Sequence, residues 1–127
     1  MVESLFRDYT ELIKEYIAFQ TISTVDSSFE IQKAVEWLNK LFKEEGFESE
    51  VIVGFDNPVI FSQKFVNKSF PTILIYGHYD VQPASKKEWG TDPFRLVRRN
   101  GRYYARGIVD NKGQMLIHLV TVLNLLK

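Results

Sequence analysis

The spacing of apolar residues predicts two amphipathic helices in the first third of the chain. Over residues 4–19, apolar side chains recur every three or four positions and charged ones fill the opposite face, as in a surface helix that covers a core. Residues 31–42 carry a second stripe of this kind. Ser27 and Glu30 have the spacing of a capping box at its start, and Gly46 provides a stop at its end.

Short apolar runs predict β-strands further along the chain. With turn-forming residues between them, they cover residues 47–53, 59–65, 72–76, 94–99 and 102–106. The run at 72–76 is apolar on both faces, which is typical of a central strand covered by helices on both sides. The last two runs flank Asn100 and Gly101, a strong hairpin signal because both turn positions take a positive φ.

The end of the chain, from about residue 111 to residue 127, predicts a third helix that is apolar around most of its circumference. Nine of the twelve residues from 115 to 126 are apolar, and a narrow polar stripe begins at Gln114. Such a helix needs cover on several sides. Together with the strands, the helices predict an α/β layered sandwich with a mixed central sheet flanked by helices. The helix could be a C-terminal helix packed across the sheet, or residues 1–127 could be part of a single domain that is cut within it.

Composition limits the classes of function. Sixteen Lys and Arg balance sixteen Asp and Glu, and a net charge of zero gives no general attraction to nucleic acid or acidic membranes. The absence of cysteine excludes disulfides and a cysteine nucleophile, and it fits a cytoplasmic location. The first residues lack the pattern of a secretory signal, and no apolar stretch has the roughly 18–20 residues needed to cross a bilayer.

Two short motifs contain residues suited to metal chemistry. His78 and Asp80 follow the predicted central strand, where ligands bind in open α/β sheets, and residues two apart in an extended segment point to the same side. A carboxylate beside a ligating imidazole fixes its tautomer; the alternative is a loop histidine in an ordinary hydrogen bond. Asp110 precedes the last helix, where it could cap the helix or bridge two metal ions. Neither motif is specific by itself.

In this order, the chain contains the segments GHYDVQPA, EW, DPF and GRYYARGIVDNKG. Together they resemble the dinuclear zinc peptidase and deacylase family, which includes carboxypeptidase G, succinyl-diaminopimelate desuccinylase, acetylornithine deacetylase, aminoacylase and carnosinase-type dipeptidases. The resemblance extends over nearly the whole chain, and the motifs are more similar to those of the dipeptidase branch.

The resemblance implies a role for each motif residue. His78 would ligate one zinc ion, Asp110 would bridge two, and Asp80 would be the catalytic acidic residue that tunes the general base. The peptide bond between Asp110 and Asn111 can be cis, as in family members. The implied activity is hydrolysis of the amide bond of a dipeptide or an N-acyl amino acid by metal-activated water.

The resemblance implies that residues 1–127 are the N-terminal part of a single metallopeptidase catalytic domain, without its lid domain and C-terminal half, so the family pattern is incomplete in this chain. The general-base glutamate and further carboxylate and histidine ligands would follow Lys127, and a catalytic zinc site needs about three protein ligands and an open position. We therefore expect residues 1–127 to be inactive alone, with at most weak zinc binding at His78. The alternatives are an N-acyl amino acid deacylase of the desuccinylase or deacetylase type and a non-catalytic binding module.

Expected partners follow from the remaining surface features. Basic and aromatic residues alternate on the predicted hairpin, as in some proteins that bind single-stranded nucleic acid, but the neutral chain favours a solvated face instead. His118 is expected to face solvent rather than a metal. The apolar helix at 113–126 predicts a homo-oligomer in which another copy covers this helix or an unpaired strand edge. We expect no nucleic acid or membrane partner.

Overall fold

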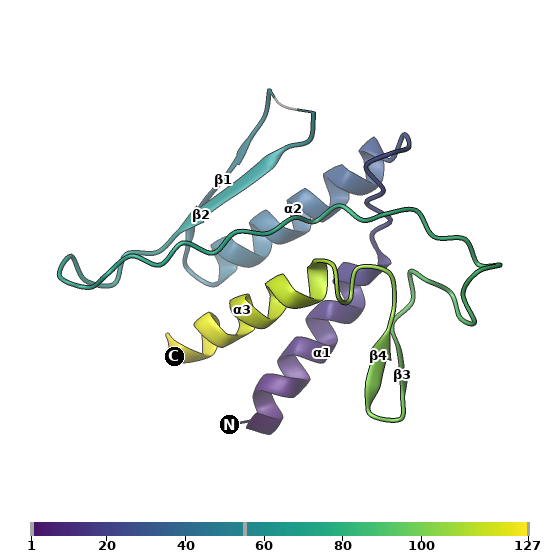
Figure 1. The fold of residues 1–127 in the computed structure, drawn as a ribbon. Coiled ribbons are helices and arrows are strands. Elements are labelled where there is room, and N and C mark those ends of the chain that lie inside the picture. Colours follow the sequence, from purple (N-terminus) through teal and green to yellow (C-terminus); the bar gives the residue numbers. More distant parts are fainter. Residues whose placement is uncertain (1, 55, 127) are drawn as a thin grey trace.

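The computed structural model describes residues 2–54 and 56–126 (Figure 1). Along these residues, two helices are followed by two antiparallel pairs of strands and a third helix, which confirms the predicted α/β class. The elements are α1 (Val2–Ala18), α2 (Ser28–Glu44), β1 (Glu48–Ile52), β2 (Val59–Gln63), β3 (Val97–Arg99), β4 (Arg102–Tyr104) and α3 (Lys112–Leu125).

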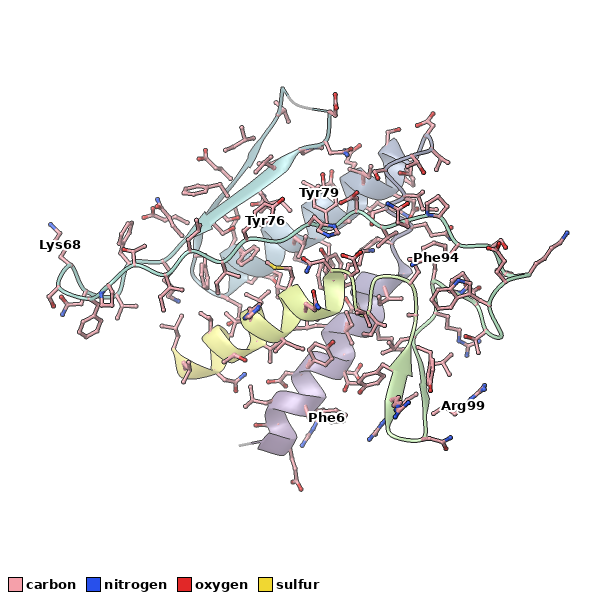
Figure 2. All side chains as sticks on the ribbon, viewed as in Figure 1. Phe6, Lys68, Tyr76, Tyr79, Phe94 and Arg99 are labelled. Carbon is pink, nitrogen blue, oxygen red and sulfur yellow. The ribbon has the colours of Figure 1, made fainter. Side chains whose placement is uncertain are left out.

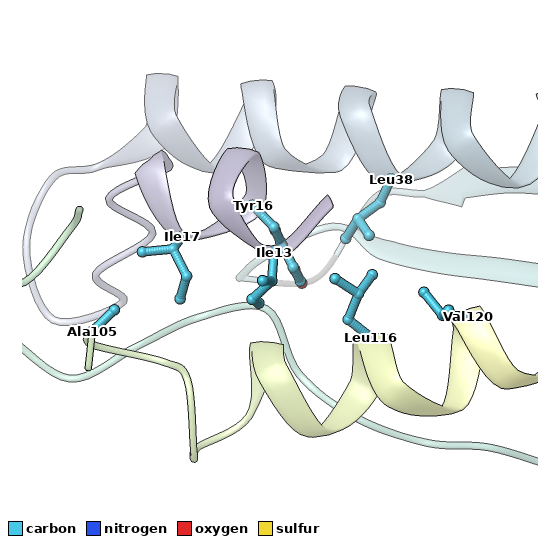
Figure 3. Packing of buried hydrophobic residues seen from close by; sticks show 7 residues of the cluster. All are labelled: Ile13, Tyr16, Ile17, Leu38, Ala105, Leu116 and Val120. Atoms are coloured by element: carbon cyan, nitrogen blue, oxygen red, sulfur yellow. The ribbon is translucent and has the colours of Figure 1, made fainter. Parts of the chain in front are cut away.

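The hydrophobic core lies where the three helices meet, as the close view in Figure 3 shows. α1 packs along α3, and α2 contributes a side chain to the same cluster. The buried cluster consists of Ile13, Tyr16, Ile17, Leu38, Ala105, Leu116 and Val120. The helical residues of the cluster lie on apolar faces that the sequence predicts, since residues three or four apart share one helix face, and Ala105 follows β4. None of the helices in the described part of the chain is long and apolar enough to cross a membrane.

The strands form two separate antiparallel pairs. β1 pairs with β2 from Glu48 opposite Gln63 to Ile52 opposite Val59, and α2 packs against this pair. β3 and β4 form the predicted hairpin, and its turn residue Asn100 has a φ of 52°. Among the residues that the structure describes, the strands do not join into one mixed central sheet.

The prediction of a central strand at 72–76 is wrong for this structure. The segment has no strand pairing, and the side chains of Ile73, Leu74 and Tyr76 are 81%, 87% and 86% exposed. It runs as an extended chain beside α3 (Figure 1). A strand exists only where a neighbouring strand supplies hydrogen-bond partners, and the described residues place none beside this segment.

The predicted capping box at the start of α2 is also wrong. Ser27 is the residue before the helix, but its hydroxyl donates to the carbonyl of Ile22 at 2.6 Å and makes no cap bond. The Glu30 carboxylate instead accepts from the backbone N–H of Gln20 at 3.1 Å. Both side chains are used to fasten the connection between α1 and α2. The helix nevertheless has the predicted extent, because its apolar stripe packs on the core.

Candidate functional site

The ring of His78 lies between two carboxylates. Its Nδ1 is 2.9 Å from Oδ1 of Asp80, and its Nε2 is 3.1 Å from Oδ1 of Asp110. His78 and Asp80 belong to the extended segment on which Figure 2 labels Tyr76 and Tyr79, whereas Asp110 comes just before α3. The structure therefore brings the three predicted site residues together, although Asp110 is 32 residues away from the histidine.

Both ring nitrogens of His78 face a carboxylate oxygen, and this constrains what can lie between them. A neutral imidazole has only one N–H, so it can donate to one of the two carboxylates and must turn a lone pair toward the other. Two acceptors in contact are stable only when a proton or a metal ion lies between them. The 3.1 Å between Nε2 and Asp110 Oδ1 is close to the separation of about 3.4 Å that two ligands of a tetrahedral zinc ion have. The donor set thus fits a metal ion.

The site is open to solvent. The side chain of His78 is 42% exposed and that of Asp110 is 77% exposed. One carboxylate oxygen of Asp110 faces the histidine, and the high exposure leaves the carboxylate accessible to a further ligand. In the described ranges, 2–54 and 56–126, no group of three His, Cys, Asp or Glu side chains is placed to hold one metal ion.

The segment before α3 has the local geometry needed to present Asp110. The peptide bond between Asp110 and Asn111 is cis, as the resemblance implied. Asn111, rather than Asp110, is the N-cap residue of α3. The Asn111 side chain accepts from the backbone N–H of His78 at 3.1 Å and donates to Gln114 at 2.8 Å. The Asp110 carboxylate is therefore not used as a helix cap and lies against the histidine.

Two glycines allow the close approach of these segments. A Cβ on Gly77 would collide with the side chain of Met115 on α3, and a Cβ on Gly113 would collide with the backbone carbonyl of Ile108. Gly77 precedes the histidine, and Gly113 lies in the first turn of α3. Both positions therefore require a residue without a side chain.

The burial of Lys112 was not predicted from the sequence. Its side chain is completely buried, and its Nζ donates to the carbonyls of Phe19 at 2.7 Å and Tyr16 at 3.1 Å. Burial lowers the pKa of Lys112 to about 7, although the charges of Glu30 and Asp80 act in the opposite direction. Its position in the helix could have indicated this burial, because residue 112 precedes the buried stripe at 116, 120 and 123 by one helical turn.

His118 does not join the site. It is exposed on α3 and lines an open hollow of about 340 Å³ together with Tyr76 and Gln114.

On the hairpin, the ring of Tyr103 stacks on Phe6 of α1 at 6.2 Å. This aromatic side chain packs against α1.

Comparison with known proteins gives consistent matches. Residues 74–127 match the model of Peptidase family M20/M25/M40. The chain is 32% identical to a cysteinylglycine-S-conjugate dipeptidase of Corynebacterium striatum, over 92% of this chain and 26% of the relative. It is 31% identical to a succinyl-diaminopimelate desuccinylase of Wolbachia pipientis wMel, over 94% of this chain and 29% of the relative. Over 46% of this chain and 12% of the relative, it is 43% identical to a Beta-Ala-His dipeptidase of Mus musculus.

The fold comparison agrees with the sequence comparison. The crystal structure of human carnosine dipeptidase 1 superposes with a TM-score of 0.82 and 25% sequence identity, over 99% of this chain and 32% of that one. The family resemblance expected from the motifs is therefore confirmed. The chain spans about a quarter to a third of the length of the relatives that it matches along most of its own length.

Proposed function

We propose that this chain, which resembles Peptidase family M20/M25/M40 in sequence and in fold, supplies the first part of the metal site of a hydrolase. The reaction would be cleavage of the amide bond of a dipeptide or an N-acyl amino acid. One observation carries this proposal: both nitrogens of the His78 ring face carboxylate oxygens, from Asp80 and Asp110. That arrangement suits a metal ligand with an orienting partner.

Each site residue has a separate task in this proposal. His78 and Asp110 would hold zinc, and the exposed Asp110 carboxylate could contact a second ion. Asp80 would accept a hydrogen bond from Nδ1–H of the histidine, and this tautomer would leave the lone pair of Nε2 free for the metal. When bound, the metal ions lower the pKa of a water molecule and polarise the carbonyl of the substrate.

The relatives support two related substrates. Cysteinylglycine-S-conjugate dipeptidase and Beta-Ala-His dipeptidase are named for dipeptides, and the structural neighbour is a carnosine dipeptidase. Succinyl-diaminopimelate desuccinylase is named for an N-acylated compound. We favour a dipeptide substrate because the dipeptidase names recur in both comparisons, and an N-acyl amino acid is the second candidate. A cytoplasmic location, which the lack of cysteine favours, belongs to the same proposal.

The 127-residue chain alone should be inactive. Its described residues bring only one imidazole and one carboxylate to the proposed metal position, whereas catalytic zinc sites have about three protein ligands. Loss of a general base alone lowers rates by about 10²–10⁴-fold. We therefore expect weak zinc binding and no zinc-dependent hydrolysis by this chain.

Isothermal titration with Zn²⁺ tests the proposed site. His78→Ala and Asp110→Asn should each abolish the binding, and His118→Ala is the matched control because His118 is an exposed histidine outside the site. Binding that His118→Ala abolishes and His78→Ala leaves intact would overturn the assignment. A panel of dipeptides and N-succinyl amino acids tests the inactivity. Zinc-dependent turnover that disappears in His78→Ala would show that the chain is a complete catalyst.

We also propose that the chain associates with further copies of itself. Large apolar side chains on the 72–76 segment and on α3 are exposed, among them Leu74 and Leu125 at 87% and 80%. Contiguous exposed apolar surface favours association, and an extended segment without a strand partner offers free backbone groups. The neutral chain carries no net charge that would keep copies apart.

A further inference from the structure

The two halves of the candidate site come from distant parts of the chain. His78 and Asp80 belong to the extended segment, and Asp110 belongs to the approach to α3. Two direct contacts link the two halves: the backbone N–H of His78 donates to the side chain of Asn111, and the His78 ring meets the Asp110 carboxylate. A third segment, the end of α1 and the residues after it, contacts both of them. We refer to residues 16–21 as the α1 junction.

Thr21 fastens the first half of the site to the α1 junction. This threonine is completely buried, and its hydroxyl donates to the carbonyl of Tyr79 at 2.6 Å. Its own carbonyl accepts from the backbone N–H of Val81 at 2.8 Å. Residues 79 and 81 flank Asp80. Two hydrogen bonds to one buried threonine therefore set the position of the backbone that carries Asp80.

Lys112 fastens the second half to the same junction. Its buried amino group donates to the carbonyls of Tyr16 and Phe19 and lies 4.9 Å from the centre of the Tyr16 ring. Carbonyls at the end of a helix lack partners within the helix, so a donor from elsewhere satisfies them. Lys112 is two residues after Asp110. The bonds of its side chain therefore set where the backbone of the aspartate lies.

The two attachments meet at Gly107. A Cβ placed on this glycine would come 3.0 Å from Val81 and 3.3 Å from the side chain of Lys112. The glycine is thus packed between the residue that bonds to Thr21 and the lysine that bonds to the end of α1. The backbone N–H of Gly113 also donates to the carbonyl of Gly107 at 3.0 Å. The two halves of the site share one tightly packed support.

We propose that Thr21 and Lys112 are positioning residues, which hold His78 and Asp110 within reach of one metal ion by fixing both halves of the site to the α1 junction. The consequence for metal binding rests on the proposed function, whereas the contact of His78 with Asp110 exists without a metal. The side chains of both residues donate to backbone carbonyls, of Tyr79 and of the α1 junction. Their removal should separate the two ligands while leaving both side chains present.

The test uses the two histidines of the full chain as probes. NMR spectra of histidine-labelled protein report on His78 in the site and on His118 outside it, without added metal. In Lys112→Met and in Thr21→Val, the His78 signals should shift and the His118 signals should stay. Thr21→Ser keeps the hydroxyl and should retain the wild-type His78 signals. The matched controls are Lys14→Met, at an exposed lysine of α1, and Thr121→Val, at an exposed threonine of α3.

Titration of the same variants with Zn²⁺ measures the consequence for the site. Removal of groups that orient metal ligands lowers metal affinity by about 10–100-fold, and we expect a loss of this size in Lys112→Met and Thr21→Val. Unchanged His78 signals in Thr21→Val, together with a lower melting temperature, would show a purely structural role and overturn the inference. If Lys112→Met does not fold, the comparison of Thr21→Val with Thr21→Ser decides. Failure of the wild type to bind zinc would refute the proposed function, while the metal-free spectra still test the positioning.

Discussion

The pKa of Lys112 shows how surroundings that exclude water change the charge of one side chain. The amine is buried, and two carbonyls at the end of α1 accept its hydrogen bonds. A neutral amine has two N–H groups, so it can satisfy both carbonyls without a charge. Burial favours this neutral form, and the pKa is accordingly lowered to about 7 from 10.5.

The lowered pKa of Lys112 predicts a pH dependence of stability. Between pH 7 and pH 10, the unfolded chain holds a proton on this lysine that the folded chain has mostly released. Stability rises with pH wherever the unfolded state binds more protons, so the free energy of unfolding should increase across this window. Below pH 7 both states are protonated and the contribution no longer changes.

Urea denaturation at several pH values measures this effect. Lys112→Met should lose most of the increase between pH 7 and pH 10, and Lys14→Met, which removes an exposed lysine from α1, should keep it. An identical pH profile for Lys112→Met and the wild type would contradict the prediction.

At the scale of the elements, the contact of the extended segment with α3 depends on the absence of a side chain at Gly77. A Cβ there would collide with Met115 and with the side-chain oxygen of Asn111, which also accepts the N–H of His78. The segment that carries the site is therefore pressed against the first turns of α3. Any larger residue has to push the two elements apart.

Gly77→Ala should destabilise the fold and disturb the site. Overpacking of a tight contact costs about 1–3 kcal/mol, and the displaced segment carries His78. Chemical denaturation should show this loss of stability, and the His78 NMR signals should shift. Gly90→Ala is the matched control, because a Cβ on Gly90 meets nothing within 4 Å. Equal stability of the two variants would show that α3 can yield at this contact.

At the scale of the whole molecule, an exposed apolar surface lies where the 72–76 segment passes α3. Ile73, Leu74 and Tyr76 are exposed there, and no charged residue interrupts residues 69–77. Charged side chains are a usual protection of open strand edges. The extended segment therefore has both the apolar side chains and the free backbone groups that favour pairing with another copy.

Sedimentation velocity should show a dimer or a larger assembly of the wild-type chain. Leu74→Lys introduces a charge into the proposed contact and should shift the distribution toward the monomer. Val53→Lys is the matched control, since Val53 is 74% exposed but lies at the end of β1. A wild-type chain that is monomeric at high concentration would refute the proposed association.

The local sequence pattern was sufficient to predict the helices and the β3–β4 hairpin. A helix satisfies its backbone within itself, and its apolar stripe marks the buried face, so the extents of α1, α2 and α3 follow from spacing alone. The hairpin is likewise local, since Asn100 and Gly101 determine its turn. The motifs also gave His78, Asp80 and Asp110 as candidate site residues, because residue type and order along the chain are enough to recognise a family resemblance.

Only the tertiary structure decided which distant groups meet. Whether the 72–76 run becomes a strand depends on a partner that its own residues cannot supply, and the described chain provides none. The contact between His78 and Asp110 depends on how the extended segment packs against the start of α3, and the burial of Lys112 depends on how α3 packs against α1. Spacing along the chain determines neighbours within one element, whereas contacts across 32 or 93 residues exist only after packing has brought those elements together.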